Sequence, residues 1–300
     1  MSTPNGVITA PRVKERGARR GTLWPTLRAI YIIWYRDVLR YWRDRTRLVA
    51  SLAQPLLFLI VFGTGLSSAL SGAGGGFAGP AAAAAGLTYT QFIFPGIIGM
   101  SVLFSAIFGA MSIVWDREFG FLKEVLVAPI DRSAVAIGKS LGGATQAMVQ
   151  GLILLILAPF IGVKLTVGSV IALLPLVFVL AFALSAMGVA IASRMRSMQG
   201  FQVVMNFLMM PMFFLSGALF PLSGLPAWMT VLTRLDPAAY GMDPLRRVVL
   251  GGAGLPSSAL DRIGLTVFDT VLPIVVEAAI LLAFGVVMLA IAVRNFRIRD

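Results

Sequence analysis

The sequence predicts an all-α polytopic membrane protein with six transmembrane helices. Six apolar stretches are long enough to cross a hydrocarbon core of about 30 Å, which requires about 20 helical residues. They cover residues 48–70, 92–115, 140–163, 165–193, 201–220 and 270–293. Hydrophobic residues make up 58% of the chain and charged residues only 13%, whereas soluble domains carry roughly 25% charged residues.

Lysine and arginine alternate in density between the two sides of these stretches. Of the 25 such residues, the segment before Leu48 holds 11, the 116–139 loop 4, the 194–196 turn 2 and the C-terminal tail 3. The intervening loops hold only Lys164 and four residues between 221 and 269. Because cytoplasmic loops carry an excess of these residues, the pattern predicts a multi-pass protein of a prokaryotic plasma (inner) membrane with both termini in the cytoplasm.

Composition also excludes several kinds of chemistry. The chain has no cysteine and no histidine, so it can form no disulfide, thiolate nucleophile or imidazole base. We therefore expect no catalytic residue and no metal site. The net charge of +12 resides mainly in the predicted cytoplasmic loops, where anionic lipid headgroups account for it, and we expect no nucleic-acid partner.

The segment before the first span divides into two parts. Residues 1–23 are basic and poor in apolar side chains, which predicts a disordered tail. Residues 24–46 have the period of an amphipathic helix, with apolar residues on one face (Trp24, Leu27, Tyr31, Trp34, Val38 and Trp42) and arginines on the other (Arg36, Arg40, Arg43 and Arg47). Such a helix lies in the plane of the membrane interface; the alternative is a helix packed on a soluble partner.

The cytoplasmic loop at 116–131 has the pattern of a short helix. Its apolar residues share one side (Phe119, Leu122, Val125 and Leu126). Pro129 ends the helix, because the residue before a proline is disfavoured in helical geometry, and Asp131 is a plausible N-cap for the third span. The helix could either transmit force to a soluble partner or rest on the membrane surface.

Gly138-Lys139-Ser140 resembles the end of a phosphate-binding loop, G-x-x-x-x-G-K-[ST]. The first glycine of that pattern would stand at position 133, where the chain has Ser133, and no strand precedes it. We therefore predict no nucleotide site in this chain and interpret Lys139 as a cytoplasmic charge that sets the topology.

The fifth stretch is long for one span and short for two. We expect a helix at 201–220, then an outer hairpin region at 221–235 whose short helix (227–235) either re-enters the outer leaflet or lies at the interface with Trp228 as an anchor. The fifth span carries methionines and a phenylalanine suited to varied hydrophobic ligands. The candidate substrate-path residues are Met205, Met209, Met212 and Phe213, although each could equally face lipid or another helix.

Glu277 is the only acidic residue inside a predicted span. A carboxylate within a membrane is by default a functional candidate that faces a cavity or a partner. Near an interface it can instead extend toward the headgroups. We count Glu277 among the candidate substrate-path residues.

Three motifs stand in order along the chain: EFGFLKEVLVAP from Glu118 with Gly138-Lys139 after it, FLSGALFPL from Phe214, and DPAAYGMDPLR from Asp236. Together with six spans they resemble the membrane subunit of type-2 ATP-binding cassette (ABC) exporters, in particular daunorubicin-type resistance permeases and nodulation-factor exporters. The resemblance covers about residues 24–294. It implies that 24–46 is an elbow helix and that 221–235 belongs to a re-entrant outer hairpin.

The resemblance also implies a coupling helix within 116–131 that docks on a separate ATP-binding subunit, with Glu118, Phe119, Gly120, Leu122, Leu126 and Pro129 as its site residues. Two copies of that subunit would bind ATP and magnesium, so this chain would need no cofactor. A second permease chain, identical or paralogous, would complete the exporter for a drug, lipid or glycolipid. The alternatives are a passive channel or scaffold, or an integral membrane enzyme, for which the spans offer almost no polar lining or catalytic groups.

Overall fold

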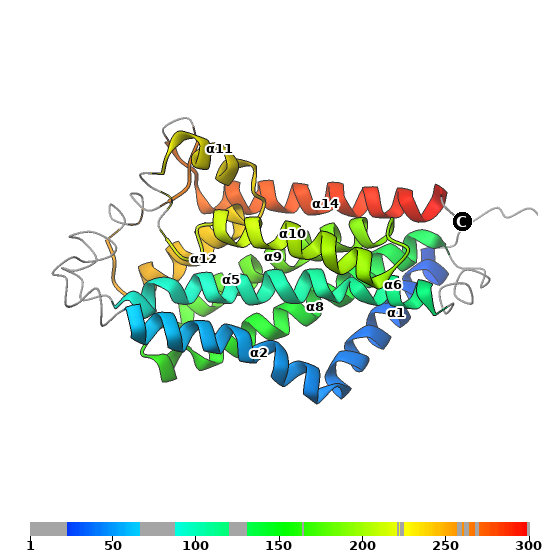
Figure 1. Ribbon diagram of the computed structural model, residues 1–300, viewed down its shortest axis with the longest axis horizontal. Coiled ribbons are helices and arrows are strands. Elements are labelled where there is room, and N and C mark those ends of the chain that lie inside the picture. Colours follow the sequence, from blue (N-terminus) through cyan, green and yellow to red (C-terminus); the bar gives the residue numbers. More distant parts are fainter. Residues whose placement is uncertain are drawn as a thin grey trace, which may run out of the picture.

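The computed structural model describes residues 23–66, 88–119, 131–163, 165–220, 222, 225–256, 260, 264–267 and 270–298. Within them the chain is almost entirely helical (Figure 1). The helices are α1 (Leu23–Arg43), α2 (Arg45–Ile60) continued by a π-helix (Val61–Leu66), α5 (Tyr89–Gly109), α6 (Met111–Glu118), α8 (Arg132–Leu157) continued by a 3-10 turn (Ala158–Ile161), α9 (Val167–Ala192), α10 (Met198–Leu215), α11 (Ala227–Leu235), α12 (Ala239–Gly252) and α14 (Ile274–Ile298). Two short strands, β1 (Thr266–Val267) and β2 (Thr270–Val271), pair antiparallel.

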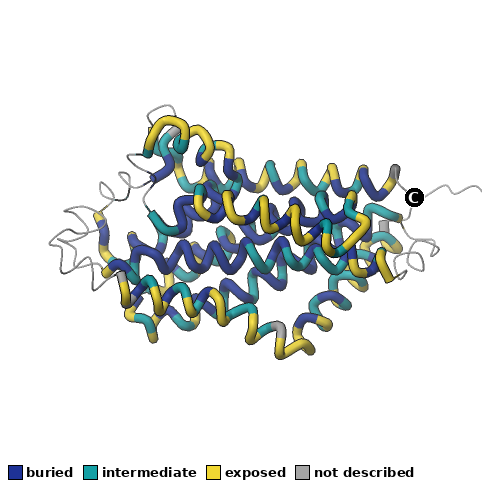
Figure 2. Tube along the Cα trace, viewed as in Figure 1, coloured by how far each residue is buried: buried dark blue, intermediate teal, exposed yellow. Residues whose placement is uncertain are grey.

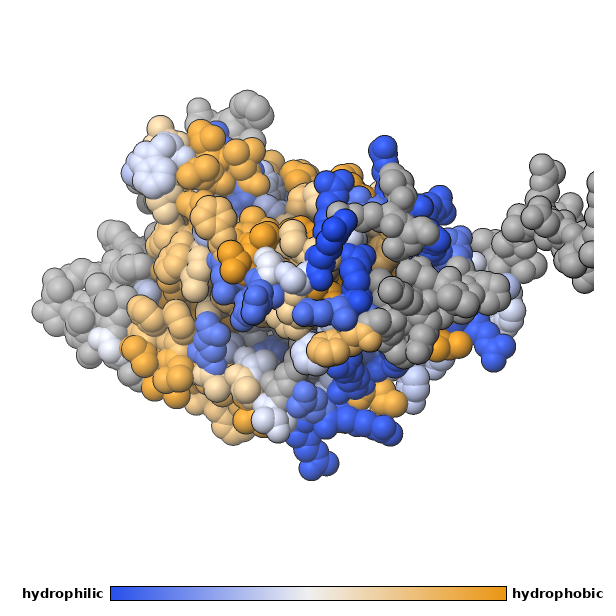
Figure 3. Space-filling model, turned by 45° about the vertical axis from the view of Figure 1, so that its right-hand side comes forward, coloured by the Kyte–Doolittle hydropathy of each residue, from blue (hydrophilic) through white to orange (hydrophobic). Residues whose placement is uncertain are grey.

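The prediction of an all-α polytopic membrane protein is confirmed. Five helices in the described part of the chain are long and apolar enough to cross a membrane: Tyr89–Glu118, Arg132–Ile161, Val167–Ala192, Met198–Leu215 and Ile274–Arg297. A sixth follows if α1 and α2, which meet at 70°, are counted as one bent span. Hydrophilic residues gather toward the end of the molecule where α6, the C-terminal end of α14 and the start of α1 lie, and hydrophobic residues cover most of the rest of the face in Figure 3.

The elbow predicted at 24–46 corresponds to α1. Trp24, Tyr31 and Trp42 are exposed on it, as expected for aromatic side chains at headgroup depth. The same helix also has a side packed on α8, where the indole nitrogen of Trp34 donates to the Thr145 hydroxyl at 2.9 Å. Residues 1–22 of the predicted basic tail lie outside the described residues.

The third span begins earlier than 140–163, the range that hydropathy predicts. Asp131 caps α8 by accepting the backbone N–H of Ser133 at 3.0 Å, which confirms the predicted N-cap. Hydrogen bonds from the Ser133 backbone and side chain lower the pKa of the Asp131 carboxyl. The added turns pack closely on α1, since a Cβ at Gly138 would lie 2.9 Å from the Ile33 side chain. The helix therefore extends past the apolar stretch because α1 covers its first turns.

The buried centre of the bundle is formed by α5, α8 and α9 (Figure 2). Fifteen of the 21 residues of α5 are buried. Small residues allow close contacts: Ser185 of α9 donates to the Ser140 carbonyl at 2.8 Å, and a Cβ at Gly143 would lie 2.4 Å from the Ser185 hydroxyl. The small residues Gly143 and Ser185 thus allow α8 and α9 to approach closely.

The end of the bundle opposite the α6 end carries α11 and α12 (Figure 1). Helix α11 has the bounds predicted from sequence, 227–235, and it exposes Trp228, Val231 and Leu235. Whether it enters the membrane stays a prediction. Helix α12, which sequence reasoning left within a loop, is mostly buried and packs on α5, α9 and α14. We attribute the miss to its composition, since a helix carrying Asp243, Arg246 and Arg247 does not resemble a buried one.

Candidate functional site

The candidate site lies at the end of α6 and the start of α8, the two helices joined by the 119–131 connection. Of the coupling residues that the family resemblance implies, the structure describes Glu118 and Phe119; Gly120, Leu122, Leu126 and Pro129 lie outside the described residues. Phe119 is 68% exposed, and its ring lies 5.1 Å from that of Trp115. An exposed phenylalanine at the start of this connection is available to a partner.

Glu118 has a partner within the chain. One of its carboxylate oxygens accepts the backbone N–H of Met198 at 3.1 Å, at the first residue of α10. A carboxylate is stabilised at a helix N-terminus by the unpaired N–H groups and the helix dipole. Glu118 therefore joins the end of α6 to the start of α10.

Arg117 joins the same end of α6 to α9. Its guanidinium donates to the carbonyl oxygens of Ser193 at 3.0 Å and Met195 at 2.6 Å. The last carbonyls of a helix lack partners within the helix, and a cation there also opposes the negative end of its dipole. Asn295 of α14 donates to the Ser193 hydroxyl at 2.9 Å, so α6, α9 and α14 meet at one polar junction.

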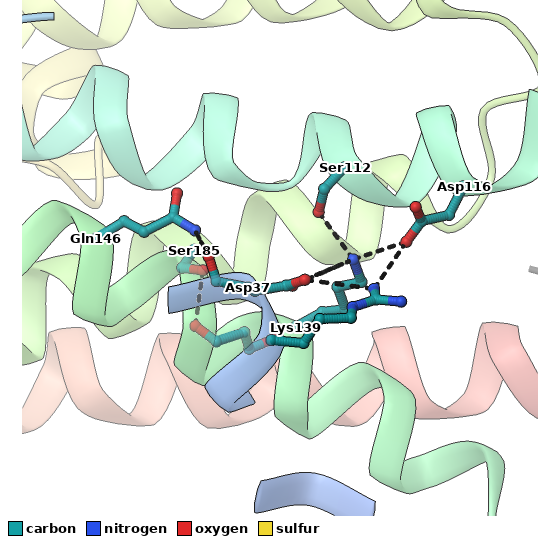
Figure 4. A network of polar contacts seen from close by, with 8 residues as sticks. Asp37, Ser112, Asp116, Lys139, Gln146 and Ser185 are labelled. Atoms are coloured by element: carbon teal, nitrogen blue, oxygen red, sulfur yellow. Dashed lines mark hydrogen bonds and ion pairs between the residues drawn. The ribbon is translucent and has the colours of Figure 1, made fainter. Parts of the chain in front are cut away.

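A buried cluster of charges includes Asp116, the residue before Arg117. Lys139 of α8 is only 4% exposed. Its amine lies 2.8 Å from an Asp116 carboxylate oxygen and 3.1 Å from one of Asp37, and it donates to the Ser112 hydroxyl at 3.0 Å. Figure 4 shows these side chains converging between α1, α6 and α8. Lys139 is therefore a buried ion-pair centre, and its role in setting the topology stays a prediction.

The cluster contains two cations and two carboxylates. Arg36 lies 3.2 Å from Asp116 and 3.3 Å from Asp37, with 38% of its side chain exposed. Burying charges is costly unless each is paired and hydrogen-bonded, and here both carboxylates contact both cations. We call Arg36, Asp37, Asp116 and Lys139 the inner charge cluster.

The inner charge cluster ties together the two helices that lead into and out of the 119–131 connection. Asp116 belongs to α6, before it, and Lys139 to α8, after it, while Asp37 adds α1. Sequence reasoning missed the cluster because its members are 23 and 102 positions apart. One signal was present: Asp37 is an acidic residue in an otherwise basic helix.

The predicted substrate-path residues on α10 are buried within the helix bundle of this chain. Met205, Met209, Met212 and Phe213 are at most 6% exposed and belong to the hydrophobic core. The Phe213 ring lies 6.4 Å from that of Phe58 and 6.5 Å from that of Phe104. The other face of α10 is exposed instead, at Val203, Phe207, Met210 and Phe214.

Glu277 is fully buried and forms an ion pair with Arg247. Arg247 also lies 3.1 Å from an Asp243 carboxylate oxygen and donates to the Leu272 carbonyl at 2.8 Å. We call Asp243, Arg247 and Glu277 the outer charge cluster; it joins α12 to α14. Complete burial contradicts the alternative in which Glu277 extends to the headgroups.

A cavity of about 330 Å³ opens among α1, α2, α5 and α8. Its walls contain both polar and apolar side chains: Tyr41, Ala50, Ser51, Gln54, Pro55, Met100, Ser101, Phe104, Ser105, Phe108, Met111, Gln146 and Gln150. None of the predicted substrate-path residues lines it.

Comparison with known proteins supports a transport role. The chain is 25% identical over 254 residues to a ycf38 transport permease of Cyanophora paradoxa, with 83% of each chain covered. It is 24% identical to nodulation protein J of Rhizobium leguminosarum bv. viciae (83% of this chain, 92% of the relative). It is 25% identical to the inner membrane transport permease YadH of Escherichia coli K12 (76% and 85%).

The family model described as ABC-2 type transporter matches residues 28–250. The match runs from the elbow helix through the inner charge cluster and all spans but the last, and ends in α12. Since it covers well over half of the 300 residues, the chain belongs to the ABC-2 type transporter family.

Proposed function

We propose that this protein is the permease subunit of an ATP-binding cassette exporter that moves a hydrophobic or amphiphilic substrate, such as a drug, lipid or glycolipid, out of the cytoplasm or the inner leaflet. Two copies of a separate ATP-binding subunit bind and hydrolyse ATP with magnesium, and this chain supplies no ATPase site. The observation that carries the proposal is the set of ion pairs and hydrogen bonds beside the 119–131 connection. They hold the end of α6 to α8, to the residues that follow α9 and to α10.

Force on that connection would reach several helices at once. Asp116 and Lys139 hold α6 to α8 and α1, Arg117 holds it to α9, and Glu118 holds it to α10. A push at the connection therefore moves these helix ends together instead of bending one of them. Two permease chains, identical or paralogous, would then rock relative to one another around a central path.

The exposed face of α10 is suited to that second chain. Phe207 is 82% exposed and Val203 69% exposed, beside Met210 and Phe214. Such a surface can face lipid or another apolar helix, and helix association in membranes depends on packing of this kind.

The topology can be tested directly because the chain has no native cysteine. Single cysteines at Gly75 and Ser257 should react with a membrane-impermeant maleimide added to intact cells, since the positive-inside pattern places them outside. A cysteine at Ser133, beside the α8 cap, should react only after permeabilisation. Labelling of the Ser133→Cys variant in intact cells would reverse the proposed orientation.

The coupling role is tested by capture of the ATP-binding subunit. If Phe119 and Leu122 fill a groove on that subunit, Phe119→Ala and Leu122→Ala should each weaken the contact by about 2 kcal/mol or more, which is about thirtyfold or more in affinity. Co-purification of the ATP-binding subunit, normalised to permease in the membrane, should fall, and transport should be lost.

Arg28→Ala is the control, because Arg28 is an exposed arginine of α1 and not part of the 119–131 connection; it should leave capture intact. Glu118→Ala separates two roles. Loss of its bond to the Met198 N–H should impair transport even where capture persists. Full capture and full transport in both Phe119→Ala and Leu122→Ala would exclude the coupling assignment.

A further inference from the structure

The cavity among α1, α2, α5 and α8 lies in the half of the bundle nearer the inner charge cluster. The lining residues of α2 lie between Ala50 and Pro55. At 1.5 Å per residue they are about 8–15 Å along the helix from Arg45, at its charged start. Met111, which also lines the cavity, is the first residue of α6 and precedes Ser112, whose hydroxyl contacts the Lys139 amine. Ala50 and Gln54 are exposed, so the cavity reaches the protein surface along α2.

The cavity walls have two chemical characters. Uncharged hydrogen-bonding groups come from seven residues: Tyr41, Ser51, Gln54, Ser101, Ser105, Gln146 and Gln150. Apolar groups come chiefly from Phe104, Phe108, Met100 and Met111. None of the lining residues carries a charge, so a charged ligand would lose its hydration without gaining a counter-ion.

Most of the polar wall is already held in place. The Gln150 carbonyl oxygen accepts the Ser51 hydroxyl at 2.9 Å and the Tyr41 hydroxyl at 3.3 Å, while its amide donates to the Ser51 carbonyl at 2.7 Å. These bonds join α1, α2 and α8 into a rigid wall. Gln146 likewise donates to the Asp37 carbonyl at 3.3 Å.

Ser101 differs from these residues. It is 2% exposed, it lines the cavity, and its hydroxyl has no hydrogen-bond partner among the described residues. A buried hydroxyl without a partner is costly, and such groups are rare in folded proteins. An unsatisfied hydroxyl in the wall of a cavity is the arrangement expected where a ligand supplies the missing partner.

We propose that this cavity binds the uncharged, hydrogen-bonding head of an amphiphile from the inner leaflet. Ser101 bonds an amide or hydroxyl of the head, and Phe104, Phe108 and Met111 contact the apolar part. A cavity of about 330 Å³ is at the small end of ligand pockets, so it fits a head and the start of one chain. The inference refines the substrate class of the proposed exporter and in that respect rests on the proposed function.

The test uses the cysteine-free chain in lipid nanodiscs. A Ser101→Cys variant is alkylated with N-ethylmaleimide in the presence of decanoyl-N-methylglucamide, whose head is uncharged, or decanoate, which has the same acyl chain and an anionic head. The glucamide should slow alkylation several-fold, and decanoate should not. Equal protection by both probes, or protection by neither, would overturn the proposal.

Two further variants control for membrane partitioning and for cavity access. A Val203→Cys variant, on the exposed face of α10, should react at the same rate with either probe, because both probes partition into the bilayer. An Ala50→Phe variant, which narrows the mouth of the cavity, should lose direct binding of radiolabelled glucamide; this readout does not require a maleimide to pass the same mouth. Ser101→Ala should weaken direct binding of radiolabelled glucamide by about three- to tenfold, the value of one hydrogen bond.

The source of the ligand is resolved in proteoliposomes that contain the permease and its ATP-binding subunit. A transported amphiphile accelerates ATP hydrolysis and crosses the membrane, whereas a resident lipid occupies the cavity without either effect. Protection of Ser101→Cys supports the site in both cases. Failure to capture an ATP-binding subunit would refute the exporter function and leave the alkylation result unchanged, so the two failures are distinguishable.

Discussion

Replacing Lys139 with methionine should lower the free energy of unfolding by about 3–5 kcal/mol, the cost of removing one partner from a buried ion pair. The substitution leaves the Asp37 and Asp116 carboxylates, at 5% and 6% exposure, with only the partly exposed Arg36 as a counter-ion. A loss of this size is a large part of the total stability of a typical domain. The measurement is the unfolding midpoint and the yield of the purified permease in detergent.

Two controls bracket this effect. Ser112→Ala removes one hydrogen bond to the Lys139 amine and should cost only about 1 kcal/mol. Arg28→Met removes an exposed charge and should cost almost nothing. If Lys139→Met had the same unfolding midpoint as Arg28→Met, the inner charge cluster would have no role in stability.

A triple variant separates stability from positioning. Lys139→Met combined with Asp37→Leu and Asp116→Leu replaces the three buried charges of the cluster with apolar side chains, which often restores or improves stability; Arg36 is 38% exposed and stays in contact with solvent. We expect a recovered unfolding midpoint but impaired ATP-driven transport, because the polar link that fixes α6 against α8 and α1 is gone. Full transport by the triple variant would mean that the cluster serves folding alone.

Replacing Arg247 with methionine should destabilise the opposite end of the bundle by a similar amount, about 3–5 kcal/mol. Arg247 is the counter-ion of both Asp243 and Glu277, whose side chains are fully buried. Without it the two carboxylates keep their mutual repulsion, and the Leu272 carbonyl loses its donor. Thermal unfolding in detergent is the measurement, and α12 is expected to detach from α14 first.

Glu277→Gln is the matched comparison for Arg247→Met. The amide keeps an oxygen that can accept from Arg247, so the loss should be smaller, about 1–2 kcal/mol. Unchanged stability with altered transport would instead favour a role for Glu277 in the substrate path. Equal losses in Glu277→Gln and Arg247→Met would show that the Arg247–Glu277 pair, without Asp243, accounts for the effect.

The fold was predictable from sequence because hydropathy and charge act over whole segments. Long apolar runs indicated α5, α8, α9, α10 and α14, and local chemistry indicated the Asp131 cap and the bounds of α11. Hydropathy alone missed the first turns of α8, between the Asp131 cap and the apolar stretch at 140–163, and the existence of α12 was missed. Both depend on tertiary contacts, since α1 covers the first turns of α8 and the buried Arg247 of α12 pairs with Glu277 of α14 as well as with Asp243 of its own helix.

The site was predictable only in part. The 119–131 connection was recognised by its motif, but the residues that fasten it were not, because no periodicity relates Asp37, Asp116 and Lys139. Glu277 was singled out for its charge, but its partner Arg247 was assigned to an outer loop. The methionines of α10 were chosen for their chemistry, which does not reveal that the chain buries them in its own core.

The ion pair between Asp116 and Lys139 joins the two ends of the 119–131 connection across its base. Residues within the connection and residues within the spans can then vary with little effect on each other. A lineage could change which ATP-binding subunit it engages by altering the connection alone, and change its cargo by altering the membrane helices alone. Grafting residues 120–130 from a related permease should accordingly transfer partner choice while the host protein keeps its own substrate.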